Sequence, residues 1–338
     1  MRSFLLLICI VAGCSSPQSR VVLYCAQDRE FAEELLKQFT SESKLELASK
    51  FDTEANKSVG LYQELISEAN RPRCDVFWNN EILSTIRLQK KGLLEVVSLP
   101  SRKDYPPWTQ ASDGTWQAFA SRARVLIVNT DLVPQAKHPR RSVDLLNEEW
   151  KGKLVMAKPQ FGTTATQVAC LFEVLGSEPT KSFYRGLKKN DIAIVAGNKQ
   201  VAEQVAAGRF ALGLTDQDDA IGEIDAKKPV ALIFLDREGD PENPRLGTLL
   251  IPNTLAVLRN GPNKKGGERL MNFLLAPAQE KHLAEGGGFQ IPLNPTVDFI
   301  PHPALREVKN LKPMEVNWER AAELWDEVQA FLREEFAR

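Results

Sequence analysis

Residues 118–131 read AFASRARVLIVNTD and fall near the middle of the chain, between two halves that each alternate strands with helices. Residues 125–128 form a continuous apolar run that is entered through two arginines and left through a polar turn at 129–131, a pattern typical of a buried strand beside a cleft. A second apolar run, GTLLIPNTLAVLR, follows at residues 247–259. Two such crossings between two halves of a chain predict a hinge, and a hinge beside a cleft indicates that a ligand is captured between two lobes.

Both halves of the chain alternate strands with helices. In the first half, apolar strands are expected at Val21–Tyr24, Lys44–Phe51 and Asp75–Trp78, each followed by a helical pattern. This βαβαβ order predicts the α/β class, with mainly parallel sheets flanked by helices. The ligand crevice of such a sheet lies beyond the carboxyl ends of its strands. Near the end of the chain, residues 318–338 carry one amphipathic stripe and predict a single long helix.

Acidic side chains follow several of the expected strands. The candidate ligand-binding carboxylates, which share this position at a strand end, are Asp28, Glu54, Glu81, Asp216, Asp218 and Asp219. Carboxylates that meet in one cleft repel one another, so they need a cation or bound protons. Their oxygens are hard ligands that suit Fe³⁺, Mn²⁺, Ca²⁺ or Mg²⁺, and they also suit a protonated organic amine. The alternative for each carboxylate is an N-cap or a surface charge, and Asp28 and Asp219 are well placed as caps.

Neutral and basic side chains complete the candidate site. Trp78 and Asn80 belong to the end of the third strand, where the indole either offers a cation–π face or packs in the core. Arg122 and Arg124 alternate along the central strand and therefore point to the same side. There they either bind an anionic ligand group or hold the carboxylates in place.

A glycine and two threonines open a helix in the second half of the chain. Gly162, Thr163 and Thr164 follow an expected strand at residues 154–157. Free backbone N–H groups and hydroxyls at a helix start form a cradle for an anion or a carboxylate. Simple N-capping is the alternative interpretation of the same three residues.

The composition excludes several classes of function. At 338 residues the chain is long enough to form two domains. Its net charge is −1 and it has no stripe of basic residues, so we do not expect nucleic acid as a partner. The three histidines lie away from the expected strand ends of the cleft, and no Ser/His/Asp, Cys/His, GxGxxG or P-loop pattern is present. We therefore expect neither an enzyme nor an intrinsic cofactor.

The first residues are not expected to belong to the fold. Residues 1–13 have a short positive start and an apolar run that is too short to span a bilayer. Residues 11–14, Val-Ala-Gly-Cys, resemble the lipobox of bacterial lipoproteins. That resemblance implies that residues 1–13 are a signal peptide, that Cys14 carries the lipid anchor, and that residues 14–20 are a tether. A plain signal peptide with an incidental cysteine is the alternative.

Several motifs together resemble one known family. They are LYCAQDREFAEELLKQF at residues 23–39, DVFWNNE at 75–81, SRARVLIVN at 121–129, WKGK at 150–153 and FLLAPAQEKHLAEGGGFQIPLNP at 273–295. With the second crossing, their order and spacing are similar to those of the bacterial extracellular solute-binding proteins of the ferric-iron-binding type, which feed ABC importers. The resemblance covers residues 20 to 300.

This resemblance implies a two-lobed periplasmic-binding-protein fold of the second type. Residues 21–122 together with 250–338 are then expected to form lobe 1, and residues 123–249 lobe 2. Together with the lipobox at residues 11–14, it implies a lipid-anchored receptor at the periplasmic or outer face of a bacterial membrane. We expect this receptor to be a monomer that delivers a small solute to an ABC permease and its ATPase.

The ligand that the resemblance implies is ferric iron or its chelate, although the iron-binding residues of the family are only partly matched. Asp28 stands where the iron binders have a histidine, and Asn80 with Glu81 where they have a glutamate. Asp218 and Asp219 stand in place of the two tyrosines that supply the iron-binding phenolates.

By this match the expected metal ligands are Asp28, Glu81, Asp218 and Asp219, and the family's anion-binding loop corresponds to residues 160–164. Because the tyrosine pair is missing, two alternatives stay open. The ligand is a small organic cation or phosphonate, such as a thiamine-like or aminophosphonate molecule, or the chain is a lipoprotein scaffold or sensor that does not take part in transport.

Overall fold

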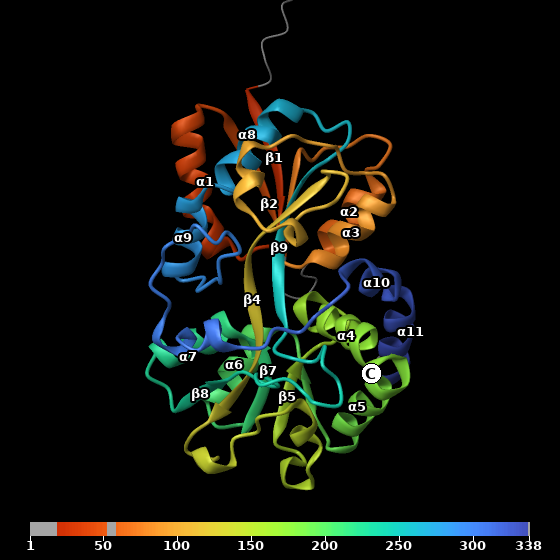
Figure 1. Cartoon of the computed structure of the whole chain (residues 1–338), viewed down its shortest axis with the longest axis vertical. Helices are drawn as coiled ribbons and strands as arrows, with labels where there is room; N and C mark the ends of the chain where they lie inside the picture. The colour runs from red at the N-terminus through yellow and green to blue at the C-terminus, as the bar shows by residue number, and fades with distance from the viewer. Residues whose placement is uncertain (1–18, 53–58, 337–338) are drawn as a thin grey trace, which may run out of the picture.

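The computed structural model describes residues 19–52 and 59–336. Cys14 and Glu54 lie outside these residues. Figure 1 shows an elongated molecule in which two lobes lie one above the other, each a sheet flanked by helices, so the predicted α/β class is confirmed. Two long strands, β4 (Trp116–Asn129) and β9 (Leu250–Val257), connect the lobes.

The upper lobe begins with alternating strands and helices, as the sequence predicts. In chain order these are β1 (Arg20–Cys25), α1 (Arg29–Ser43), β2 (Glu46–Phe51), α2 (Val59–Ser67), β3 (Val76–Asn79) and α3 (Ile82–Lys90). β1 lies between β2 and β3 and runs parallel to both, and β9 extends the sheet beside β3 in the antiparallel direction. The carboxyl ends of the three parallel strands therefore face the lower lobe (Figure 1).

Helix α1 illustrates how the sequence forms these elements. Its buried residues, Ala32, Leu35, Leu36 and Phe39, follow the spacing that places side chains on one face of a helix. The helix ends at Lys44, which adopts the left-handed conformation with φ of 60°. The buried face packs with β1 and β9 in one hydrophobic cluster, so α1 covers one side of the upper sheet.

The lower lobe repeats the alternation. In chain order its elements are β5 (Leu154–Ala157), α4 (Gly162–Leu175), α5 (Ser177–Lys189), β6 (Ala193–Val195), α6 (Asn198–Ala206), β7 (Leu212–Asp216), α7 (Gln217–Asp225) and β8 (Val230–Ile233). β5 lies between β6 and β7 and is parallel to both. Gly213 in β7 lets α6 pack closely, because a Cβ at this position would lie 2.6 Å from the Cγ1 of Val201.

Strand β4 belongs to both lobes. All fourteen of its residues are buried, as expected for an apolar strand that crosses the middle of a molecule. It pairs with β9 through Ala123 and with β7 from Arg124 onward, both in the antiparallel direction. The sheet therefore runs β2-β1-β3-β9-β4-β7-β5-β6, with β8 also paired to β4. This change of partner lies beside the expected lobe boundary, and the boundaries themselves stay a prediction.

The last helices connect the two lobes. α8 (Lys264–Leu274) and α9 (Pro277–Glu285) pack on the upper sheet, whereas α10 (Trp318–Glu323) contacts both α3 and α4, and α11 (Trp325–Phe336) contacts α4. The prediction of a single helix here is wrong, because the helix breaks at Leu324.

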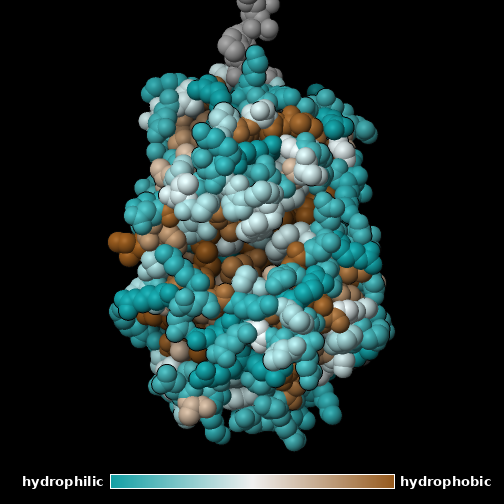
Figure 2. Space-filling view, viewed as in Figure 1, coloured by the Kyte–Doolittle hydropathy of each residue, from teal (hydrophilic) through white to brown (hydrophobic). Residues whose placement is uncertain are grey.

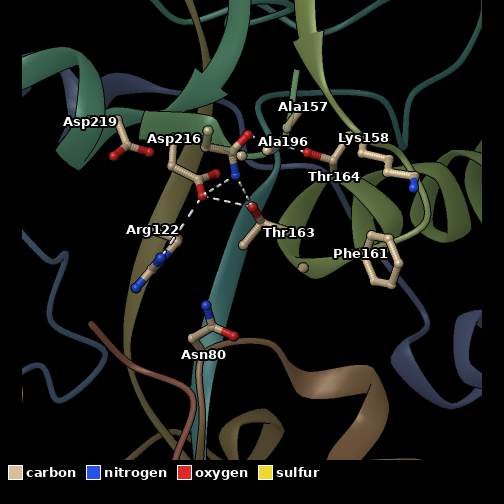
Figure 3. Close-up of a pocket in the computed structure, with 13 residues that line it drawn as sticks. Asn80, Arg122, Ala157, Lys158, Phe161, Thr163, Thr164, Ala196, Asp216 and Asp219 are labelled. Atoms are coloured by element: carbon tan, nitrogen blue, oxygen red, sulfur yellow. Dashed lines mark hydrogen bonds and ion pairs between the residues drawn. The ribbon is translucent and has the colours of Figure 1, made fainter. Parts of the chain in front are cut away.

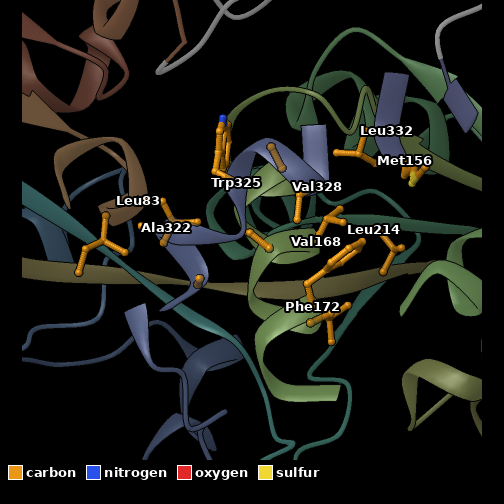
Figure 4. Packing of buried hydrophobic residues seen from close by; sticks show 14 of the residues in the cluster. Leu83, Met156, Val168, Phe172, Leu214, Ala322, Trp325, Val328 and Leu332 are labelled. Carbon is orange, nitrogen blue, oxygen red and sulfur yellow. The ribbon is translucent and has the colours of Figure 1, made fainter. Parts of the chain in front are cut away.

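The break allows α10 and α11 to follow two different surfaces. Figure 4 shows Ala322 and Trp325 between Leu83 of the upper lobe and Val168 of the lower lobe. The apolar stripe that the sequence shows is therefore buried, but it is divided between two short helices.

The surface is mostly hydrophilic on the face shown in Figure 2, except for a hollow at mid-height where apolar residues gather. An apolar pocket of about 480 Å³ lies over the hinge strands, lined by Leu250, Pro252, Ile291 and Trp318, with Trp108 beside them. Within the described ranges, no helix is long and apolar enough to cross a membrane.

Candidate ligand-binding site

A small pocket lies between the lobes, where the ends of β3 and β7 and the start of α4 meet β4 (Figure 3). Asn80 reaches it from the upper lobe, Arg122 from β4, and Thr163, Asp216 and Asp219 from the lower lobe. The cavity has a volume of about 20 Å³, which is room for about one water molecule. The structure thus brings together predicted site residues that are far apart in the sequence.

Three carboxylates form a cluster beside this pocket, which Asp216 and Asp219 line and Asp218 does not. Asp216 ends β7, and Asp218 and Asp219 lie in the first turn of α7, where the helix dipole favours negative charge. One carboxylate oxygen from each residue lies within 4.8 Å of those of the other two. Oxygen donors at this spacing can share one hard cation.

The guanidinium of Arg122 lies beside these carboxylates. The residue is only 2% exposed, and its Nη1 lies 3.7 Å from Asp218 Oδ2 and 3.9 Å from Asp216 Oδ2. Burial lowers the pKa of Arg122, but Asp218 and Asp216 raise it by more, so its pKa lies above the ordinary value and the group stays charged. Its Nη2 donates to Gln27 Oε1 at 2.6 Å, while its Nε has no hydrogen-bond partner among the described residues.

Arg124 points to the same side as Arg122, as the alternation of β4 predicts, and holds Asp216. Its Nη1 donates to Asp216 Oδ1 at 2.7 Å. Asp216 Oδ2 also accepts hydrogen bonds from Thr163 Oγ1 at 2.7 Å and from Asn198 Nδ2 at 3.0 Å. Asp216 is therefore tied into the lower lobe, and its main role in this arrangement is to hold the start of α4 against the end of β7.

The start of α4 lines the pocket with Gly162, Thr163 and Thr164. Gly162 has φ of +54°, a conformation that glycine adopts without strain. Both threonine hydroxyls are used inside the protein, because Thr163 donates to Asp216 and Thr164 donates to Asn198 Oδ1 at 3.3 Å. What remains for a ligand at this end is the positive pole of a fourteen-residue helix.

Glu81 is placed differently from its predicted role as a metal ligand. Its carboxylate caps α3, accepting from the N–H groups of Leu83 at 2.6 Å and Ser84 at 3.0 Å. It also accepts from Thr166 Oγ1 of α4 at 3.1 Å, so it connects the two lobes. The extended backbone at Glu81 turns the carboxylate back onto its own helix, and its neighbour Asn80 lines the pocket instead.

Two other predicted residues lie away from the pocket lining. Trp78 is fully buried in the hydrophobic cluster of the upper lobe, where its ring lies 5.4 Å from that of Phe119. Asp28 is half-buried at the N-cap position of α1, and its charge helps to raise the pKa of Arg122. The proposed roles of Asp28 and of Glu54, which lies outside the described residues, stay predictions.

Two polar residues contribute to the site without having been predicted as site residues. Gln27 follows β1 and accepts from Arg122, and Asn198 opens α6 and contacts Arg124, Thr163 and Asp216. Gln27 lies two residues after the end of β1, and Asn198 three residues after the end of β6. The same strand-end rule that indicated the carboxylates would have found them if amides had been included.

Comparisons with known proteins identify the family. The family model described as bacterial extracellular solute-binding protein matches residues 85–323. Iron uptake protein A1 of Synechocystis sp. is 23% identical over 279 residues, which cover 81% of this chain and 76% of that protein. The Fe(3+)-binding periplasmic protein of Serratia marcescens is 25% identical over 205 residues, 60% of this chain and 58% of that protein.

Solved structures share the fold. Iron-bound HitA from Pseudomonas aeruginosa has a TM-score of 0.81 at 20% identity, covering 94% of this chain and 99% of its own. The periplasmic binding protein AfuA from Actinobacillus pleuropneumoniae, with exogenous fructose-6-phosphate bound, has a TM-score of 0.81 at 19% identity, covering 94% and 98%. The two-lobed architecture that the sequence predicts is the architecture of these proteins, and the family model spans most of the chain. The chain therefore belongs to the bacterial extracellular solute-binding proteins.

Proposed function

We propose that this chain captures a metal ion of the ferric type, together with the oxygen-rich anion that chelates it, and delivers the complex to an ABC permease. The observation that carries this proposal is the cluster of three carboxylates beside a buried, charged Arg122, of which Asp216 and Asp219 line an interlobe pocket. The names of the relatives support it, because two of them are described by iron uptake or Fe(3+) binding.

The charges favour a cation and an anion bound together. Arg124 neutralises Asp216 at 2.7 Å, and Asp218 and Asp219 are placed to meet a hard cation. Arg122 and the start of α4 border the same pocket and favour negative oxygens. A bare cation would be repelled by the Arg122 guanidinium, whereas a bare anion would be repelled by the carboxylates. A chelated metal ion matches both signs of charge.

The size of the pocket bounds how far the lobes must open for each candidate ligand. As the lobes stand, a cavity of about 20 Å³ accommodates one ion or water, so a chelated metal ion needs a wider opening between the lobes, and an organic cation of thiamine size needs several hundred Å³. Larger ligands require the lobes to move apart about β4 and β9. An organic cation is also opposed by Arg122, which carries its positive charge to the edge of the pocket.

A second candidate is a phosphorylated or phosphonate solute bound without a metal. It is favoured by the Nε of Arg122, which has no hydrogen-bond partner in the part of the chain that the structure describes, and by the helix start that borders the pocket. The structural likeness to AfuA adds support, since that protein is described with a sugar phosphate bound. We find no observation that favours a scaffold or sensor outside transport.

Thermal unfolding separates these candidates. Ferric citrate at one hundred times its Kd is expected to raise the Tm by about 4 °C, because ligand binding to the native state adds about 2.7 kcal/mol to its stability. Citrate alone is expected to raise the Tm much less, and EDTA added in excess is expected to reverse the ferric shift. The measurement is differential scanning fluorimetry of the mature protein in buffer without phosphate.

Two other results would contradict the metal proposal. A shift that citrate, inorganic phosphate or 2-aminoethylphosphonate produces without iron, and that EDTA leaves unchanged, favours the second candidate. The absence of a shift with ferric citrate, with Fe³⁺ supplied as its nitrilotriacetate complex and with the metal-free anions would remove both candidates.

The membrane association of the chain is part of the same proposal. The family acts as the solute-binding component beside an ABC permease and ATPase, and we propose that Cys14 anchors this member as a monomer to the membrane that holds them. The Val-Ala-Gly-Cys sequence supports the anchor. In cells of the source organism or a bacterial host, Cys14→Ser is expected to move the protein from the detergent phase to the aqueous phase of a Triton X-114 extraction. Equal partitioning of both forms would contradict the anchor.

A further inference from the structure

Strand β4 contains one extra residue in the middle of the hinge. Phe119 pairs with Asn253 and Ser121 pairs with Pro252, so Ala120 has no counterpart in β9 and forms a β-bulge. Ala120 has φ of +45°, which is unusual for a residue with a Cβ. The hinge therefore holds its central residue in a conformation that alanine rarely adopts without support.

The bulge decides which side chain faces the ligand pocket. One extra residue reverses the alternation of every residue that follows in the strand. After the bulge, Arg122 lies opposite Ile251 and lines the ligand pocket, whereas Ser121 lies opposite Pro252 and lines the apolar pocket. With Ala120 paired regularly, Ser121 would occupy the side of the ligand pocket and Arg122 the apolar side.

A buried carboxylate collects the backbone N–H groups at the bulge. Glu280 of α9 is fully buried, and its Oε1 accepts from the N–H groups of Ala120 and of Leu293, the latter at 2.9 Å. Its Oε2 accepts from the N–H of Asn294 at 3.0 Å. The N–H of Ala120 cannot pair with β9 because of the bulge, and an unpaired buried N–H is costly. Glu280 avoids this cost because its Oε1 accepts the hydrogen bond from Ala120.

The carbonyl of Ala120 is held as well. Asn253 Nδ2 donates to it at 3.3 Å from β9. The next residue, Ser121, exchanges two backbone hydrogen bonds with Ile291 at 2.7 Å and 2.8 Å, just before the segment that Glu280 holds. The bulge is therefore fixed from α9, from the 291–294 segment and from β9 at once.

We propose that Glu280 is a positioning residue for solute binding: it stabilises the bulge at Ala120 and so directs Arg122 into the ligand pocket. The inference deepens the proposed function and rests on it for the ligand, but the orientation of Arg122 is measured without any ligand. Glu280 itself does not touch the solute. It acts through the backbone of β4 on a side chain two residues further along.

The test compares Glu280→Gln with Asp75→Asn. The glutamine keeps the size of the side chain, but its amide nitrogen must face one of three N–H donors. Asp75 is a matched control, because it is a fully buried acid that accepts from the backbone N–H groups of Val22 and Asn263, away from the pocket. Two readouts are used: phenylglyoxal modification of Arg122, mapped by mass spectrometry with the exposed Arg185 as standard, and calorimetric titration with ferric citrate.

E280Q is expected to expose Arg122 to phenylglyoxal and to weaken ferric citrate binding by about tenfold or more, since a binding group tolerates a displacement of only about 0.5 Å. D75N is expected to change neither readout. Ala120→Gly in the E280Q background is expected to restore part of the affinity, because glycine adopts the positive φ without strain. A purely structural role of Glu280 under the 293–294 segment predicts no such rescue.

Distinct outcomes overturn the two proposals. The role of Glu280 would be overturned if phenylglyoxal modifies Arg122 no faster in E280Q than in D75N and the affinity for ferric citrate is unchanged. If the wild-type protein does not bind ferric citrate, the proposed ligand fails, and the reactivity of Arg122 still decides the inference. If E280Q does not fold, Asn253→Ala replaces it, because it removes the bond to the Ala120 carbonyl and is expected to expose Arg122 in the same way.

Discussion

Replacing Arg124 with methionine is expected to lower the free energy of unfolding by about 3–5 kcal/mol, the cost of leaving one partner of a buried ion pair without the other. Arg124 is 4% exposed and Asp216 is 2% exposed, so neither charge is screened by water. Methionine keeps the apolar length of the side chain but leaves Asp216 without its contact at 2.7 Å. The measurement is urea unfolding followed by circular dichroism.

Two further variants test this explanation. Removing both charges, with Arg124→Met and Asp216→Asn together, is expected to recover much of the loss, because the uncompensated buried charge is then gone. Arg185→Met is the matched control: Arg185 also contacts a carboxylate at 2.7 Å, that of Glu335, but its side chain is 49% exposed and the change is expected to be small. If R124M lowers the free energy of unfolding no more than R185M does, the Arg124–Asp216 pair is not a buried ion pair that stabilises the fold.

The order of secondary structure predicted much of the pocket. Because the carboxyl ends of parallel strands meet at one edge, the rule needs only the positions of strands and not their packing. The rule pointed to Asn80, Asp216 and Asp219, which line one pocket between the lobes, whereas their role in ligand binding stays a prediction. The alternation along β4 also placed Arg122 and Arg124 on one side, and it succeeded because the bulge at Ala120 precedes both residues.

The same rule failed where the direction of a side chain changes from one residue to the next. Asn80 and Glu81 are neighbours, and the local backbone alone determines that the amide lines the pocket while the carboxylate caps α3. Trp78 lies just before them, but its side chain points to the core. No periodicity in a sequence resolves such one-residue choices at the end of a strand, because they depend on the φ and ψ angles of the turn into the next helix.

Contacts between distant segments were beyond sequence reasoning. Glu280 reads as an ordinary charged residue in an amphipathic helix, and only the folded chain brings it to the N–H of Ala120, 160 residues away. The break at Leu324 is similar. The pattern of residues 318–338 favours one helix, and the separate surfaces of α3 and α4 divide it into two. In both cases tertiary packing overrides a local pattern.

The double substitution Asp218→Asn with Asp219→Asn is expected to weaken the binding of ferric citrate by at least about 100-fold, which corresponds to a loss of about 2.7 kcal/mol or more. Both changes keep the shape of the side chain and remove a negative charge. The metal ion then loses two anionic oxygens and faces a site in which Arg122 is less neutralised. Isothermal titration calorimetry with the wild-type protein and the double variant measures the difference.

The loss of affinity for ferric citrate can be assigned to the two carboxylates only if the double variant remains folded. Arg122 keeps Gln27 at 2.6 Å and Asp216 at 3.9 Å but loses its buried partner Asp218, so the expected loss in the free energy of unfolding is about 3–5 kcal/mol, and circular dichroism shows whether the variant is folded. The matched control is Glu223→Gln with Asp225→Asn, which removes two charges from the opposite end of the same helix. It is expected to leave the affinity for ferric citrate unchanged.

The sign of the effect distinguishes the two candidate ligands. A chelated metal ion binds through the carboxylates, so their removal weakens it. A phosphorylated or phosphonate solute without a metal is repelled by the same carboxylates, so their removal is expected to strengthen the binding of 2-aminoethylphosphonate or inorganic phosphate to Arg122 and the start of α4. Unchanged affinity for ferric citrate in the double variant would show that the acidic cluster serves only to hold Arg122, and the metal proposal would then have no ligands in this pocket.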